Sequence, residues 1–159
     1  MNLSDTAQHA GFFAAHAVWS VCDGETLIPM LVYPSAEGKA SMTRLVSDDS
    51  RKAVADAKEN LSKVVADHGA AVLLYDTFVT LGSWRTDAIL IESVAESGRL
   101  VMAVPYRDAK SEQGFAVYRP KFIECPQEQA EVLAELFFQG VGAHEKGNAV
   151  WSKFIDQSR

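Results

Sequence analysis

Apolar residues recur at three- and four-residue steps in two stretches of the chain, and this spacing predicts two amphipathic helices. In the first stretch, Ser4 to Val21, one side of the helix collects Ala10, Phe13, Ala14, Ala17, Val18 and Val21. Ser4 is its expected N-cap, and Cys22-Asp23-Gly24 is its expected end. The second stretch begins with Ser47 or Asp48 as the cap and stops at Gly69. Its apolar side contains Ala53, Val54, Ala57, Leu61, Val64 and Val65, so we expect this helix to lie on a sheet.

The segments between and after these helices have the patterns of strands. Thr26 to Tyr33 is apolar and predicts a buried strand. Because Pro29 and Pro34 lack N–H donors, this strand is expected at a sheet edge or with a bulge. Ser41 to Val46 predicts its hairpin partner.

Residues 70–107 predict an antiparallel meander of three strands. Gly82-Ser83 forms the first turn, because a glycine in the first position of a two-residue loop matches the strand twist. The second turn lies within Glu96-Ser97-Gly98, and Phe115 to Tyr118 can add a fourth strand.

Two further helices are expected near the end of the sequence. Pro126 suits the first position of a helix whose apolar stripe is formed by Ala130, Leu133, Leu136, Phe137 and Val141. Gly140, Gly142 and Gly147 are expected to break this helix. Asn148 then caps a short helix, residues 148–159, that docks on the body.

The order is thus helix, two strands, helix, three or four strands and two helices. Hairpin-linked strands without an alternating strand–helix rhythm predict the α+β class. We expect a single domain over residues 1–159, with helices packed on an antiparallel sheet.

The composition of the chain bears on its cellular location and on the kinds of partner that it can bind. The chain has 159 residues, a net charge of -6 and only two cysteines, Cys22 and Cys125. No apolar run approaches the ~20 residues of a membrane span, and the first residues lack the pattern of a signal peptide. We therefore expect a cytoplasmic protein with no membrane partner. The acidic balance argues against nucleic acid as a partner.

No strong catalytic or metal-binding motif occurs in the sequence. A glycine-rich phosphate loop, GxSxG, CxxC and HExxH are all missing, and the four histidines are not at zinc-site spacing. The sequence therefore predicts no metal and no cofactor, and it leaves open whether the protein is an enzyme.

The first hairpin of the meander contains the candidate ligand site. If Gly82-Ser83 is a two-residue loop, Asp76, Arg85 and Asp87 project from one face. A three-residue turn at Glu96-Ser97-Gly98 would add Arg107 to that face, whereas a two-residue turn at Ser97-Gly98 would place Arg107 on the other. These groups form either a recess in which arginine grips a small anion, or a ladder of solvated ion pairs.

Glu92 lies in an apolar run of the second meander strand. A carboxylate in such a run is either a buried acid with an altered pKa or a glutamate that is edge-exposed or faces a helix with a partner. We favour the latter.

The first helix has a second apolar side. Phe12 and Trp19 are seven residues apart and lie opposite the core side, and His9 and His16 flank them. A helix that is apolar on two sides is either shared with another chain or covered within its own fold. The segment that contains Trp151 and Phe154 is the candidate cover.

Two functions follow from these patterns. The first is a non-catalytic binding protein that self-associates as a homodimer, through the first helix or a sheet edge, or binds another protein. The alternative is a small enzyme or sensor that binds an anionic small molecule through Asp76, Arg85, Asp87 and Arg107.

Overall fold

The computed structural model describes residues 2–159 and confirms the α+β class. One mostly antiparallel sheet has the order β2-β1-β3-β4-β5-β6-β8, with β7 also paired to β5. Its strands are β1 (Met30–Pro34), β2 (Ala40–Arg44), β3 (Ala70–Leu81), β4 (Trp84–Ala95), β5 (Gly98–Arg107), β6 (Ala116–Tyr118), β7 (Lys121–Glu124) and β8 (Ile155–Asp156).

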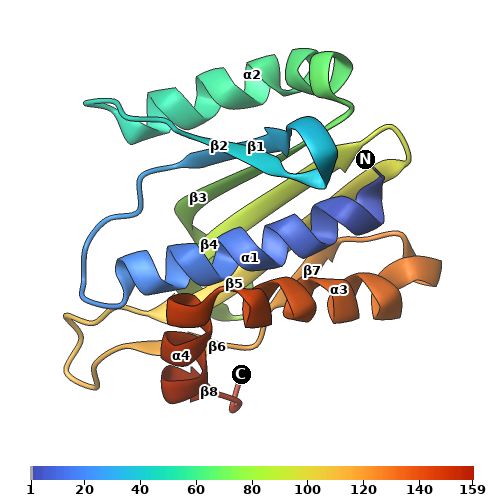
Figure 1. Cartoon of the computed structure of the whole chain (residues 1–159). Coiled ribbons are helices and arrows are strands. Elements are labelled where there is room, and N and C mark those ends of the chain that lie inside the picture. Colours follow the sequence, from blue (N-terminus) through green and yellow to red (C-terminus); the bar gives the residue numbers. More distant parts are fainter. Residues whose placement is uncertain (1) are drawn as a thin grey trace.

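Helices cover both faces of this sheet. They are α1 (Leu3–Val21), α2 (Ser50–His68), α3 (Ala130–Ala143) and α4 (Glu145–Phe154). Helix α1 lies across one face with α3 beside it, and α2 covers the other face (Figure 1).

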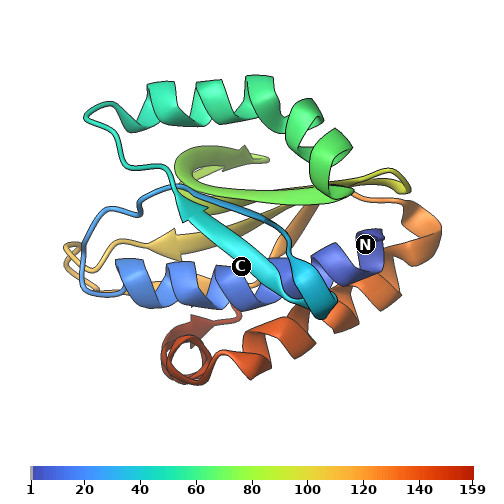
Figure 2. The same cartoon turned by 45° about the horizontal axis from the view of Figure 1, so that its top comes forward.

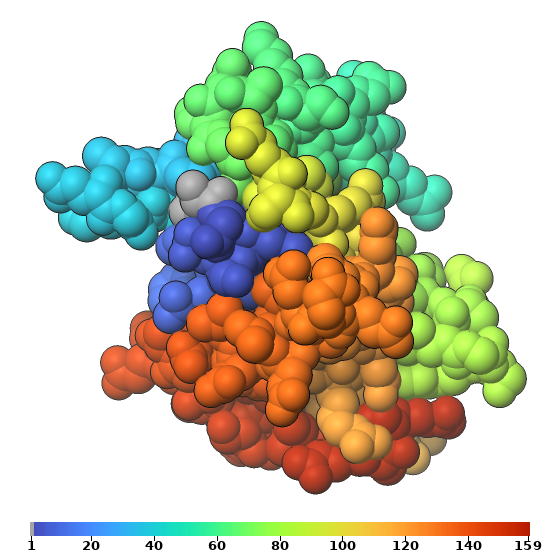
Figure 3. Space-filling view, turned by 90° about the vertical axis from the view of Figure 1, so that its right-hand side faces the viewer, coloured from blue at the N-terminus to red at the C-terminus, as the bar shows by residue number. Residues whose placement is uncertain are grey.

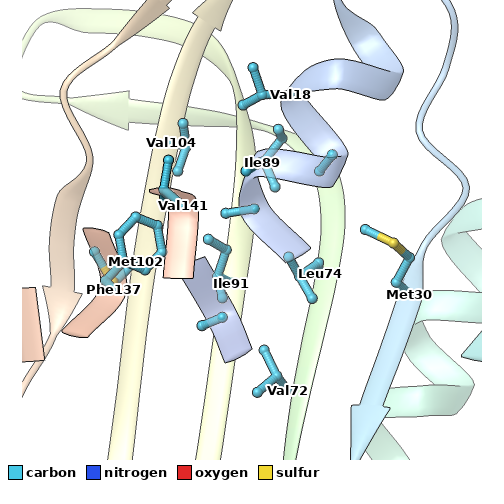
Figure 4. Close-up of a cluster of buried hydrophobic side chains, with 14 of the residues drawn as sticks. Val18, Met30, Val72, Leu74, Ile89, Ile91, Met102, Val104, Phe137 and Val141 are labelled. Atoms are coloured by element: carbon cyan, nitrogen blue, oxygen red, sulfur yellow. The ribbon is translucent and has the colours of Figure 1, made fainter. Parts of the chain in front are cut away.

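The main core lies between the sheet and the α1–α3 pair. Figure 4 shows side chains of the central strands beside those of α1 and α3, and the labelled residues include Val72, Leu74, Ile89, Val18 and Phe137. A smaller cluster on the opposite face joins α2 to the sheet through Ala57, Leu73 and Tyr75. The amphipathic pattern of α2 predicts this contact, and the structure confirms it.

Helices α1 and α3 approach each other at glycines. A Cβ added to Gly11 would lie 1.8 Å from the carbonyl oxygen of Phe137, and one added to Gly140 would lie 2.0 Å from that of Gln8. Gly147 of α4 meets the carbonyl oxygen of Ala15 in the same way, at 2.4 Å. The prediction that Gly140, Gly142 and Gly147 break a helix is wrong, because all three lie inside helices. Gly140 and Gly147 permit the close packing there.

Several predicted helix boundaries are also wrong. Asn2 rather than Ser4 caps α1, in a capping box in which Asp5 N–H donates to Asn2 Oδ1 at 3.0 Å. Asp49 replaces Ser47 or Asp48 as the cap of α2, where its side chain accepts from two backbone N–H groups. At the other end of the chain, residues 127–129 form a 3₁₀ turn before α3, and α4 begins at Glu145 instead of after Asn148.

The first predicted strand is shorter and less peripheral than expected. It begins at Met30, so Pro29 lies outside it, and Pro34 is its last residue. Strand β1 pairs with both β2 and β3, which makes β2 the edge strand. The two prolines are tolerated in this position because neither lies in the strand interior.

Glu92 faces α2, as the sequence led us to expect. Its carboxylate is buried and accepts hydrogen bonds from Tyr75 Oη at 3.0 Å and from the guanidinium group of Arg99. Lys58 Nζ of α2 lies 3.5 Å from the same carboxylate. Tyr75 and Arg99 pair this buried carboxylate from within the sheet, and Lys58 links it to α2.

Candidate functional site

The predicted turn at Gly82-Ser83 is confirmed, and it sets the geometry of the candidate ligand site. Leu81 pairs with Trp84, and Phe78 pairs with Asp87. Since side chains alternate along a strand, Asp76, Arg85 and Asp87 share one face of the β3–β4 hairpin. It is the face on which α1 lies further along the sheet.

These three residues line an open groove of about 630 Å³. Strand β1 pairs with β3 only over residues 72–74, so residues 75–81 of β3 have no strand beside them on that side. The groove occupies this gap. Its other walls are the loop that contains Thr26 and Pro29 and the first turns of α2, including Arg51.

The two arginines of the groove have no carboxylate partner. Among residues 2–159, the ion pairs use Lys52, Lys58 and Arg99, so the guanidinium groups of Arg51 and Arg85 lie beyond 4.0 Å of any carboxylate. Arg85 instead lies over the ring of Phe78, 5.0 Å from its centroid. Two positive charges are thus free to bind an anion, and one of them is oriented by an aromatic ring.

The two aspartates of the groove share their surroundings with a third carboxylate. Burial raises the pKa of Asp76, a hydrogen bond from Tyr106 lowers it, and the charges of Asp87 and Asp108 raise it further. Burial and the charge of Asp108 likewise raise the pKa of Asp87. Tyr106 Oη donates to Asp76 Oδ2 at 2.7 Å, and the pKa of this phenol is raised by burial and by the nearby carboxylates.

Arg107 does not join this face. The turn between β4 and β5 consists of Glu96 and Ser97, with Ala95 paired to Gly98, so both turns expected from the sequence are wrong. The resulting register pairs Asp87 with Tyr106 and turns Arg107 to the opposite face. There Arg107 Nε donates to the Gly114 carbonyl at 2.8 Å and orders the loop before β6.

The same register explains which residue the sequence reasoning missed. Tyr106 occupies the place expected for Arg107 and supplies the hydrogen bond to Asp76. The position of the second turn decides this pairing, because a two-residue loop at Glu96-Ser97 places Tyr106 opposite Asp87. Arg51 was missed for another reason, because its approach to the hairpin depends on how α2 lies on the sheet.

The aromatic side of α1 contacts the α3–α4 junction of its own chain. The ring of Phe12 lies 4.9 Å from that of His144, and the ring of Trp19 lies 5.9 Å from it. Lys146 Nζ lies 5.0 Å from the Trp19 centroid, and Trp19 remains 38% exposed. His9 is partly exposed on the same helix, and burial lowers its pKa. The C-terminal segment therefore covers part of this side, chiefly through His144 rather than through the aromatic residues expected from the sequence.

His16 and His144 form a hydrogen bond whose direction the geometry defines. Gly147 N–H donates to His144 Nδ1 at 2.9 Å, so the proton of neutral His144 is on Nε2. That nitrogen lies 3.1 Å from Nδ1 of His16 and donates to it. Burial is the main cause that lowers the pKa of both histidines. Protonation of His16 would place a second hydrogen between the two rings, so this contact requires neutral imidazoles.

Neither a metal centre nor a similar protein indicates what this groove binds. Within the described part of the chain, no group of three or more His, Cys, Asp or Glu side chains is arranged to hold a metal ion. No helix over residues 2–159 is long and apolar enough to cross a membrane. No protein-family model, curated protein or solved structure matches the chain.

Proposed function

We propose that this chain is a binding protein whose ligand is a small anion held in the β3–β4 groove. The observation that supports this function is the presence of two guanidinium groups without carboxylate partners, from Arg51 and Arg85, in the walls of one groove. Arginine pairs with carboxylate or phosphate through two parallel hydrogen bonds, which suits it to such a ligand.

The start of α2 determines which groups of the groove can donate hydrogen bonds to the anion. Residues Ser50 and Arg51 bring the positive end of the α2 dipole to the groove. The backbone N–H groups of Arg51 and Lys52, however, already donate to Asp49. The arginine side chains and the Ser50 hydroxyl are therefore the groups at this end of the groove that can donate hydrogen bonds to the anion.

The aspartates in the same groove define the rest of the ligand. An anion alone would lie near Asp76 and Asp87, and like charges repel in a partly buried site. A ligand that also carries an ammonium group would relieve this repulsion. We therefore propose a zwitterion, with its anionic group on Arg51 and Arg85 and its ammonium group on the aspartates.

A matched series of five-carbon probes tests this function by thermal unfolding. Glutarate carries two anionic groups, 5-aminopentanoate one of each sign, and 1,5-diaminopentane two cationic groups. A ligand at 100 times its Kd stabilises the native state by about 2.7 kcal/mol, or roughly 5–10 °C in Tm for a chain of this size. We expect 5-aminopentanoate to give the largest shift. A larger shift with glutarate removes the zwitterion but keeps the anion, and a response to the diamine alone, or to none of the three, contradicts the proposal.

Charge-neutral variants show where the probe binds. Arg85→Gln should abolish the shift, because it removes one of the two groups that hold the anion. Lys52→Gln is the matched control: it removes the same charge one residue from Arg51, where Lys52 pairs with Asp56 at 3.2 Å outside the groove lining. Equal losses in both variants would indicate an effect of net charge and would count against the groove.

Self-association is a second candidate function, and a specific feature of the sheet favours it. Strand β2 forms the outer edge of the sheet and pairs only with β1, which leaves one row of its backbone groups without a partner strand in the described part of the chain. Such an edge is a template for another extended chain. The aromatic side of α1 favours self-association less, because Phe12 and His16 already contact His144 of the same chain.

We also propose a cytoplasmic location. Cys22 and Cys125 are both free thiols, and unpaired cysteines are usual in a reducing compartment.

A further inference from the structure

Strand β2 has a neighbouring strand on one side only, so its outer edge is open in the described part of the chain. The β1–β2 hairpin, in cyan, projects from the body of the molecule in Figure 3. In Figure 2 no other segment crosses in front of β2. Thr43 and Arg44 are exposed, and Ala40, Ser41 and Met42 are partly exposed.

Two hydrogen bonds show which backbone groups of β2 point outward. Leu45 N–H donates to the Pro29 carbonyl at 2.8 Å, and the Lys39 carbonyl accepts from Ser35 N–H at 2.8 Å. Residues 39 and 45 therefore direct their backbone groups toward β1. Backbone direction alternates along a strand, and the β1–β2 register is regular throughout. The residues that present their N–H and C=O groups to the outside are consequently Ala40, Met42 and Arg44.

We propose that a second copy of this chain adds to the outer edge of β2, antiparallel to it, about a two-fold axis at Met42. This inference rests on self-association, the second function proposed above, and gives it an interface. Met42 of each copy then lies opposite its own counterpart, and Ala40 of each copy lies opposite Arg44 of the other. All outward groups on both strands become paired, with roughly six hydrogen bonds across the axis.

The side chains of β2 suit this arrangement. Arg44 is the one charged residue of the strand, and the two-fold axis places it beside Ala40 rather than beside another arginine. The two Arg44 residues are four positions apart along the paired strands, roughly 13 Å, so their repulsion is weak. On the other face of the strand, Ser41 lies opposite Thr43 of the second copy, a favourable cross-strand pair.

The position of Met42 within the edge also suits self-pairing. The outward residues are odd in number and Met42 is the central one, so a two-fold axis leaves no outward group at either end without a partner. A foreign strand can use the same edge, but nothing in the strand selects its sequence. We therefore assign the second copy as the occupant, and capture of a different strand by a chain that stays monomeric would overturn this assignment.

Disulfide cross-linking tests the interface directly. In a Cys22→Ser, Cys125→Ser background, Met42→Cys places two thiols on residues whose Cα atoms are about 5.5 Å apart, within the range for a disulfide. Val46→Cys is the control: residue 46 is 78% exposed, but in this register the two copies are about 26 Å apart there. We expect a cross-linked dimer from Met42→Cys only. Equal cross-linking at both positions overturns the register.

Residue-resolved hydrogen exchange on the wild-type chain gives a readout that does not depend on a variant. As protein concentration rises, the amides of Ala40, Met42 and Arg44 should become protected, while those of Ser41 and Thr43, which face β1, should not change. Light scattering supplies the mass. A dimer without this alternating protection overturns the β2 interface but leaves self-association standing. A single-chain mass at every concentration overturns both.

Discussion

The glycine contact between α1 and α3 makes a sharp prediction about stability. At Gly140 an added Cβ would lie 2.0 Å from the Gln8 carbonyl oxygen and 2.8 Å from the Phe12 nitrogen. Ordinary contact begins near 3.4 Å, so Gly140→Ala requires the two helices to separate by more than 1 Å. Both neighbouring atoms belong to the backbone of α1 and cannot rotate away. Because overpacking of this kind costs 1–3 kcal/mol or more, we expect a loss of about 3 kcal/mol.

Gly142→Ala is the matched control in the same helix. No atom lies within 4 Å of a Cβ added to Gly142, and this residue is exposed. Replacing a helical glycine by alanine then stabilises the fold by about 0.5–1 kcal/mol, since the unfolded chain loses flexibility. Urea unfolding should therefore show changes of opposite sign, and Tm should fall by about 6–12 °C for Gly140→Ala but rise by about 1–4 °C for Gly142→Ala. Two variants of equal stability would refute the close approach of α1 and α3.

Two further predictions concern the titratable groups. Because the pKa values of His16 and His144 are lowered in the folded protein, the unfolded chain binds more protons just below pH 6.5. The free energy of unfolding should then fall as the pH drops through this range, by at most about 1.4 kcal/mol per pH unit for each histidine. Urea titrations measure this slope of unfolding free energy against pH, and His16→Gln should reduce it. A slope that is the same in wild type and His16→Gln would show that the contact does not require neutral imidazoles. In the groove, Tyr106→Phe removes the hydrogen bond that lowers the pKa of Asp76, so this pKa should rise. NMR titration measures the pKa, and an unchanged value would mean that the bond is not formed in solution.

The sequence predicted those parts of the sheet that are set by local turn chemistry. Gly82 has a φ of 66°, a conformation that favours glycine, and the two-residue loop that it forms leaves only one register for β3 and β4. The next turn contains three residues of turn type in a row, Glu96, Ser97 and Gly98, so local chemistry allows several registers. In the observed register this turn contacts a distant part of the chain, where Leu3 N–H donates to Ser97 Oγ at 3.1 Å, and no local pattern reveals such a contact.

Very short strands and contacts between residues distant in the sequence cannot be predicted from sequence patterns. Strand β8 has two residues and β7 has four, and such lengths show no clear periodicity. The observed caps of α1 and α2 differ from the predicted ones by one or two positions, because several cap-forming residues stand together before each helix. His144 meets His16 across 128 positions of sequence, and no local pattern identifies such a partner.

The close packing of α3 against α1 determines which surfaces of this molecule remain open to a ligand or a partner. The glycines bring α3 and α4 so near to α1 that His144 lies against Phe12, and part of the aromatic side of α1 becomes an internal contact. Two places on the sheet keep groups without a protein partner in the described part of the chain: the outer edge of β2, and the groove beside β3 where β1 has ended. The groove arises because β1 pairs with only residues 72–74 of β3, and the open edge arises because β2 pairs only with β1. Backbone groups and arginine side chains without partners gain more from a new contact than a helix face that is already covered. The strands, rather than the aromatic face of α1, are therefore the place where a ligand or a second copy should be sought.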